Sequence, residues 1–155
     1  MNERRDEAMR FQEIQPEDVK ELIALRTMVK ENVLTMADLI RLGVTEVEVM
    51  RKIQADYKGW LCRVSERIVG FCIGNRHDGE MWVIAVLPEF ERRGIGRQLM
   101  TLLQDWLFEN NDELWLTTED NAKNRAYGFY ESLGWQKVES DKGHCKFILR
   151  KAAQS

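Results

Sequence analysis

The chemistry that the chain indicates most directly is the binding of phosphate, because three arginines surround two closely spaced glycines at residues 92–97. The loop opens an apolar pattern of helical spacing, so its backbone N–H groups and the positive end of the helix dipole face the same point. Glycine has no Cβ and lets the backbone approach phosphate oxygens, while arginine adds positive charge. The residues predicted to hold the phosphates are Arg92, Arg93, Gly94, Ile95, Gly96 and Arg97.

The type of phosphate ligand is narrowed by what this loop lacks. A Gly-x-Gly triplet alone is weak evidence, since most such triplets are turns or helix starts. The loop has no lysine followed by serine or threonine, and no third glycine at the spacing of dinucleotide-binding folds. Nucleoside triphosphates and NAD are therefore disfavoured as ligands.

The elements that must position this loop are a strand before it and a helix after it. The stretch 81–87 is almost entirely apolar and ends at Pro88, as expected of a central strand covered on both faces. Apolar residues then recur at helical spacing from Ile95 to about Glu109. The other patterns predict strands at 10–15, 60–64, 68–73, 114–118, 135–138 and 145–149. Helices are predicted at 19–32, after Thr35, after Thr45 and at 126–133, and residues 45–48 have the pattern of a capping box.

The domain organisation is expected to be simple, because 155 residues is close to the commonest size of one domain. We expect a single domain at 10–150, a disordered N-terminus at 1–9 and a frayed C-terminus at 151–155. A net charge of −3 gives no general attraction to nucleic acid, and no apolar run is long enough to cross a membrane. The charged N-terminus lacks a secretion signal, so the expected location is cytoplasmic.

The cysteines and histidines give little sign of further chemistry. Three cysteines leave one unpaired in any disulfide scheme, and none stands at metal-ligand spacing, so we expect buried thiols and no metal. Both histidines lie in predicted loops or strand edges, where a solvated side chain is the expected state. These residues are Cys62, Cys72, Cys145, His77 and His144.

A family resemblance joins these patterns. Residues 83–99 resemble the strand, pyrophosphate loop and helix of the GNAT acetyltransferases, and residues 125–135 resemble the second family segment. The resemblance implies the GNAT fold, an α/β (α+β) architecture in which helices flank a mixed, mostly antiparallel sheet of six or seven strands with splayed central strands. It also implies acetyl-CoA as cosubstrate. Two departures are Glu91, where the family usually has glutamine or arginine, and Lys123, where many members have asparagine.

The same resemblance assigns the remaining cofactor contacts. The main chain of Ile84, Ala85 and Val86 would bind the pantetheine arm and the thioester oxygen, with the Val86 N–H directed at developing negative charge. Asn121 or Asn124 would stand in for the asparagine that is absent at residue 123.

Two residues are predicted to move protons. The resemblance places Tyr130 near the thioester sulfur as a general acid, although its position in the helix pattern is equally that of a packing residue. Glu80 would accept the proton of the amine, which has a pKa of about 10.4 if it is like lysine. A solvated carboxylate at Glu80, or a base at Glu119, is the alternative.

The acceptor is expected to contact the region 26–35, which covers the site in this family. The residues assigned to it are Asn32, Leu34, Thr35 and, on the central strand, Trp82. The sequence thus predicts transfer of acetyl from acetyl-CoA to a primary amine of a small molecule or peptide by direct attack in a ternary complex. The alternatives are transfer of a different acyl group and a CoA-binding or ligand-sensing module without turnover. The closing strands can also pair in a homodimer.

Overall fold

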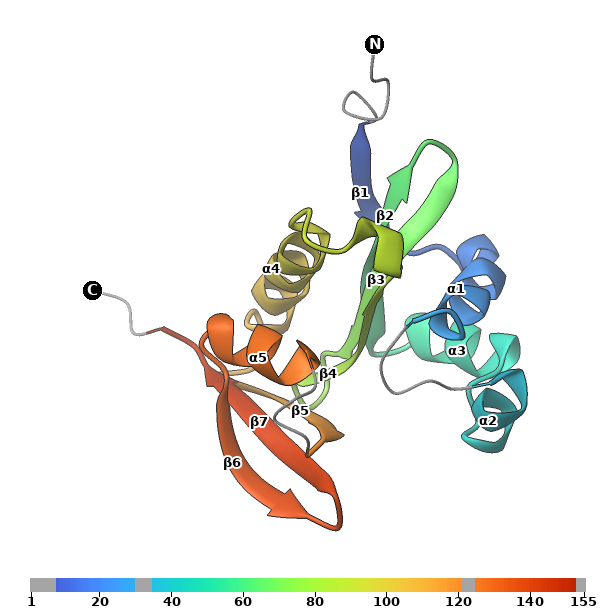
Figure 1. Ribbon diagram of the computed structural model, residues 1–155. Helices are drawn as coiled ribbons and strands as arrows, with labels where there is room; N and C mark the ends of the chain where they lie inside the picture. The colour runs from blue at the N-terminus through green and yellow to red at the C-terminus, as the bar shows by residue number, and fades with distance from the viewer. Residues whose placement is uncertain (1–7, 30–34, 121–124, 153–155) are drawn as a thin grey trace.

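A single mixed sheet organises the protein, as the computed structural model in Figure 1 shows for residues 8–29, 35–120 and 125–152. The described strands lie in the order β1-β2-β3-β4-β5-β7-β6, and every neighbouring pair is antiparallel except the parallel pair β4 and β5. The predicted mostly antiparallel α+β architecture is therefore confirmed. The strands are β1 Met9–Glu13, β2 Tyr57–Val64, β3 Arg67–Asn75, β4 Glu80–Val86, β5 Glu113–Glu119, β6 Gln136–Asp141 and β7 His144–Arg150.

Helices cover both faces of this sheet. Figure 1 shows α1 and α3 on one side, with α2 beside them, and α4 and α5 on the other. None of the helices in the described ranges is both long and apolar enough to cross a membrane. The helices are α1 Val19–Arg26, α2 Met36–Arg41, α3 Glu46–Ile53, α4 Ile95–Leu107 and α5 Arg125–Ser132, with short 3₁₀ turns η2 Pro16–Asp18 and η3 Pro88–Phe90.

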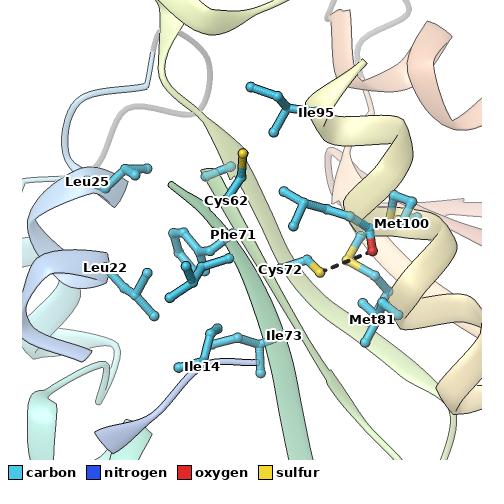
Figure 2. Packing of buried hydrophobic residues seen from close by; sticks show 14 of the residues in the cluster. Ile14, Leu22, Leu25, Cys62, Phe71, Cys72, Ile73, Met81, Ile95 and Met100 are labelled. Atoms are coloured by element: carbon cyan, nitrogen blue, oxygen red, sulfur yellow. Dashed lines mark hydrogen bonds between the residues drawn. The ribbon is translucent and has the colours of Figure 1, made fainter. Parts of the chain in front are cut away.

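The hydrophobic core lies on both faces of β3. Figure 2 shows Leu22 of α1 beside Phe71 on one face, and Met100 of α4 beside Cys72 on the other. The thiol of Cys72 donates to the carbonyl of Leu99 at 3.4 Å, and burial raises the pKa of this thiol to about 12. All three cysteines are buried free thiols, as predicted.

The strand with the most complete cover is β3 rather than β4. Seven successive residues of β3, 68–74, are buried, whereas Trp82, Val83, Ile84 and Val86 of β4 remain half-buried. The expectation that the stretch 81–87 is covered on both faces is therefore wrong. The reason is that β4 borders an opening in the sheet, which leaves part of its surface uncovered.

That opening separates β4 from β5. The two strands form one register pair, Glu80 with Trp115, at the start of β4. Beyond this pair their carboxyl ends diverge, and the residues Ile84 to Val86 on one side and Thr118 on the other line the same cavity. The predicted splay of the central strands is confirmed by this geometry.

The helix starts and ends differ from the predictions in two details. Helix α1 ends at Arg26 instead of near Asn32, and the Thr27 hydroxyl donates to the Ala24 carbonyl at 2.7 Å. The reciprocal capping box predicted at Thr45 forms instead at Thr35, which exchanges bonds with Asp38. At Thr45 the return bond is missing because the Glu48 carboxylate pairs with Arg51.

Candidate active site

A cavity of about 440 Å³ occupies the opening between β4 and β5. Its walls come from five parts of the chain: the end of β4, the loop and first turn of α4, Thr118 of β5, the helix α5, and the C-terminal end of α1. The cavity therefore gathers segments from both faces of the sheet. The predicted cofactor contacts on its wall are Ile84, Ala85, Val86, Arg92, Gly94, Ile95, Gly96, Arg97 and Tyr130.

The loop that opens α4 has the backbone geometry of an anion site. Gly94 is the N-cap of α4 and has φ +81°, in the left-handed region that glycine adopts without strain. A Cβ added to Gly94 would meet no atom of the described residues within 4 Å, so the dihedral angle, and not a lack of space, favours glycine there. Because the first four N–H groups of a helix have no intrahelical acceptor, they remain directed out of the helix end toward the cavity.

A second glycine of the loop sets how closely α5 packs. A Cβ added to Gly96 would lie in van der Waals contact with Phe129, 3.4 Å from a ring carbon. Phe129 and Gly96 both line the cavity, so the helix α5 closes directly over the first turn of α4. A larger residue at 96 would push this wall outward.

The arginines of the loop do not all face the cavity. Arg92 and Arg97 line it and are exposed to solvent at its mouth. Arg93 instead places its guanidinium 4.9 Å from the centre of the Phe90 ring. Arg93 was predicted as a cofactor contact. It does not line the cavity, and the contact stays a prediction.

The strand β4 presents a backbone donor to the cavity. The Leu87 N–H donates to the Val69 carbonyl of β3 at 2.8 Å. Successive N–H groups of a strand point to opposite sides, so the Val86 N–H points away from β3 toward the β5 side. Val86 also lines the cavity, and its role as a donor to the thioester oxygen stays a prediction.

Tyr130 is the buried phenol of the cavity. Its side chain is 6% exposed and is surrounded by the rings of Phe129, Trp135 and Phe147, with centroids 5.7, 6.2 and 5.8 Å away. Burial raises the pKa of Tyr130, and the charge of Arg26 opposes that rise. The phenol therefore stays protonated at neutral pH, which is the form that a general acid needs.

Glu80 and Trp82 lie near the closed end of the opening, and neither is on the cavity wall. Burial and the nearby Asp78 carboxylate raise the pKa of Glu80, and Lys52 opposes the shift. Trp82 packs edge-on against Tyr57 with centroids 5.5 Å apart. Glu80 and Trp82 therefore share the strand β4 with the cavity-lining residues 84–86 but do not themselves line the cavity.

Other predicted residues lie away from the cavity or outside the described residues. Thr35 is exposed at the N-cap of α2, where its hydroxyl accepts the Asp38 N–H. Glu119, the alternative base, is exposed at the end of β5. The predicted contacts Asn32, Leu34, Asn121 and Asn124 lie outside the described residues.

Among the cavity-wall residues that the sequence analysis did not name as site residues, three are charged: Arg26, Glu91 and Arg125. Arg26 stands on the apolar stripe of α1, and a charge on such a stripe was the available signal. Glu91 and Arg125 form an ion pair that joins the loop after β4 to the start of α5, and both line the cavity. Glu91, which stands where the family usually has glutamine or arginine, therefore has Arg125 as its ion-pair partner.

Comparison with known proteins identifies the class. The chain is an acyltransferase, because a family model described as the acetyltransferase (GNAT) family matches residues 30–135. The chain belongs to this GNAT family, as its two motifs predicted. No curated protein sequence matches the chain significantly.

Solved structures share the fold at low sequence identity. The PaiA N-acetyltransferase from Thermoplasma acidophilum, solved in complex with coenzyme A, has a TM-score of 0.80 and 14% identity, over 93% of this chain and 99% of that one. An acetyltransferase of the GNAT family from Staphylococcus aureus has a TM-score of 0.76 and 17% identity, over 92% and 99%. The ribosomal-protein-S18-alanine N-acetyltransferase from Escherichia coli has a TM-score of 0.72 and 19% identity, over 96% and 97%.

Proposed function

We propose that the protein transfers an acetyl group from acetyl-CoA to a primary amine of a small molecule or peptide, by direct attack of the amine on the thioester. The observation that carries the proposal is the shared cavity, in which the N-terminus of α4, the Val86 N–H side of β4 and the Tyr130 phenol meet. The complex of the similar PaiA N-acetyltransferase with coenzyme A supports the same ligand here.

The chemistry of the donor set fits the diphosphate of acetyl-CoA. Backbone N–H groups at the start of α4 bind its oxygens, and Arg92 and Arg97 add positive charge at the mouth of the cavity. Acetyl-CoA supplies the acetyl group as an activated thioester. The Val86 N–H donates to the carbonyl oxygen of this thioester as negative charge develops there, an interaction worth about 3 kcal/mol for one preorganised donor.

Two side chains handle the protons of the reaction. Glu80, at the closed end of the opening, takes the proton of the amine through water, because it does not itself reach the cavity wall. Tyr130 gives its phenolic proton to the departing sulfur. The products are the acetylated amine and CoA with a free thiol.

The proposal is tested by following thiol release with a thiol-reactive chromophore. Acetyl-CoA is combined with a panel of polyamines, amino acids, aminoglycosides and peptides with free N-termini, and propionyl-CoA replaces it in a second series. We expect at least one amine to accelerate thiol release well above hydrolysis, with acetyl-CoA preferred. Saturable acetyl-CoA binding without acceleration by any amine would favour a ligand-sensing module instead.

The variant Glu80→Gln is expected to lower kcat by about 100-fold without changing the Kd for acetyl-CoA. The raised pKa of Glu80 keeps its carboxyl protonated, and inactive as a base, to a higher pH than the ordinary value of 4.5. The wild-type rate therefore falls as pH decreases through that raised pKa, and the variant lacks this acid limb. The pH profile of kcat measures both effects.

Glu119→Gln is the matched control for Glu80→Gln, because Glu119 is an exposed carboxylate on the neighbouring strand β5. It should retain the wild-type rate and the acid limb. If Glu119→Gln loses both while Glu80→Gln keeps them, the base is Glu119.

The variant Glu91→Gln is expected to tighten acetyl-CoA binding about fivefold, or roughly 1 kcal/mol. Glu91 is a carboxylate on the wall of the cavity that holds the diphosphate, and its removal relieves repulsion between like charges. Isothermal titration calorimetry with acetyl-CoA measures the change, which should shrink at high salt.

The control for this variant is Glu89→Gln, two residues earlier. Glu89 is exposed, pairs with Arg67 at 3.8 Å and does not line the cavity, so its replacement should leave the Kd unchanged. Weaker binding by Glu91→Gln would mean that the ion pair with Arg125 supports the cavity wall more than its charge opposes the ligand.

A further inference from the structure

Arg26 and Tyr130 reach the same cavity from opposite faces of the sheet. Arg26 is the last residue of α1, and Tyr130 belongs to α5, which lies across the sheet in Figure 1. Both side chains line the cavity, where the divergence of β4 and β5 opens a passage between the two faces. In a continuous sheet these side chains would be separated by a strand.

The two groups act on each other electrostatically. Burial lowers the pKa of Arg26, and its interaction with Tyr130 opposes this shift. Within the described ranges, Arg26 supplies the charge that acts on the phenol, whose ring neighbours Phe129, Trp135 and Phe147 are uncharged. Arginine suits this position because its guanidinium keeps its proton even when half-buried.

We infer that Arg26 is a positioning residue for the proton donor: its guanidinium stabilises the phenolate that Tyr130 becomes when it gives its proton to the sulfur of CoA. The inference rests on the proposed acetyl transfer. In that step the N–C bond to the acetyl group forms, the C–S bond breaks, and the electron pair on sulfur takes the Tyr130 proton. A protonated amine loses one proton to solvent before it attacks. The proton that its nitrogen loses as the amide forms passes through Glu80 and water to the phenolate, so the enzyme is unchanged after one turnover.

A cation is needed because the phenolate forms in an apolar setting. An anion surrounded by aromatic rings loses its hydration, and a fixed positive charge in the same cavity offsets that loss. Arg92, in the loop before α4, and Arg97, in the first turn of α4, are exposed and lie at the end of the cavity where the diphosphate would bind. Arg26 is thus the cation placed for the sulfur end.

A double-mutant cycle tests whether Arg26 acts through Tyr130. Thiol release from acetyl-CoA is measured with hydroxylamine as the small nucleophile, for Arg26→Met in the wild-type and Tyr130→Phe backgrounds. We expect Arg26→Met to lower kcat about tenfold in the first background and less than about twofold in the second. Arg26→Lys should restore most of the rate, because it keeps the charge. Thermal denaturation checks that each variant is folded.

A spectroscopic measurement tests the electrostatic interaction of Arg26 with Tyr130 without turnover. The chain has three tyrosines, so ¹³Cζ-labelled tyrosine gives three resonances, and the one lost in Tyr130→Phe is that of Tyr130. We expect Arg26→Met to shift this resonance, Arg26→Lys to shift it less, and both to leave Tyr57 and Tyr127 in place. An unchanged Tyr130 resonance in Arg26→Met overturns the inference.

The cycle separates the inference from the proposed function. If Tyr130→Phe slows thiol release but Arg26→Met slows it equally in both backgrounds, the inference fails and acetyl transfer through Tyr130 stands. If Tyr130→Phe leaves the rate unchanged, the proposed role of Tyr130 as proton donor is wrong, and the inference about Arg26 falls with it.

Discussion

Replacing Tyr130 with phenylalanine is expected to lower kcat for thiol release about 100-fold, while acetyl-CoA binds with near-normal affinity. The phenol is 6% exposed, and phenylalanine keeps the ring that packs against Trp135 and Phe147. The substitution therefore removes the proton donor and leaves the apolar contacts. Stopped-flow thiol detection gives kcat, and calorimetry gives the Kd.

The pH dependence of the wild type follows from the same burial. Because the pKa of Tyr130 lies above its ordinary value of 10.0, the phenol keeps its proton throughout the neutral and mildly alkaline range. We therefore expect no loss of rate from Tyr130 ionisation below pH 10, the ordinary value. A basic limb at lower pH that disappears in Tyr130→Phe would contradict this assignment.

Tyr127→Phe is the matched control on the same helix. Tyr127 packs edge-on against Phe147 with centroids 5.0 Å apart, and its ring does not line the cavity. Its replacement removes a hydroxyl from α5 without touching the thioester region, so kcat should stay within about twofold of the wild type. Equal losses for both variants would indicate that the hydroxyls of α5 support its packing rather than the reaction.

The sequence predicted the part of the site whose residues are neighbours in the chain, which is the loop between β4 and α4. A strand, two glycines and a helix follow one another between residues 80 and 107, so the geometry of the loop is set by neighbours in the chain. Its side-chain partners are not local. Arg26 and Tyr130, 104 positions apart in the sequence, line one cavity and interact electrostatically. Glu91 and Arg125, 34 positions apart, form an ion pair on the wall of the same cavity.

The burial of β4 likewise depends on contacts that the local sequence does not predict. An apolar stretch at 81–87 predicts a strand, but composition does not say whether a neighbouring strand lies against its full length. The structure pairs β4 with β5 at one position and leaves Ile84 and Val86 facing the cavity. The apolar residues of β4 therefore line the cavity as well as pack in the core.

The loop itself gives the second large prediction, which is that Gly94→Asp abolishes acetyl-CoA binding, with the Kd raised at least about 100-fold. At φ +81° an aspartate is strained, and its carboxylate stands at the N-cap of α4, where the diphosphate would bind. Repulsion between anions then replaces attraction to the helix terminus. Calorimetric titration with acetyl-CoA measures the loss.

Gly143→Asp separates strain from repulsion. Gly143 has φ +83°, and a Cβ there, as at Gly94, would meet nothing within 4 Å, so the two substitutions carry the same backbone strain and the same added charge. Gly143 lies in the turn between β6 and β7, away from the start of α4. Both variants should lose similar thermal stability, but only Gly94→Asp should lose the ligand. If Gly94→Asp binds acetyl-CoA as tightly as Gly143→Asp does, the diphosphate is not held at the N-terminus of α4.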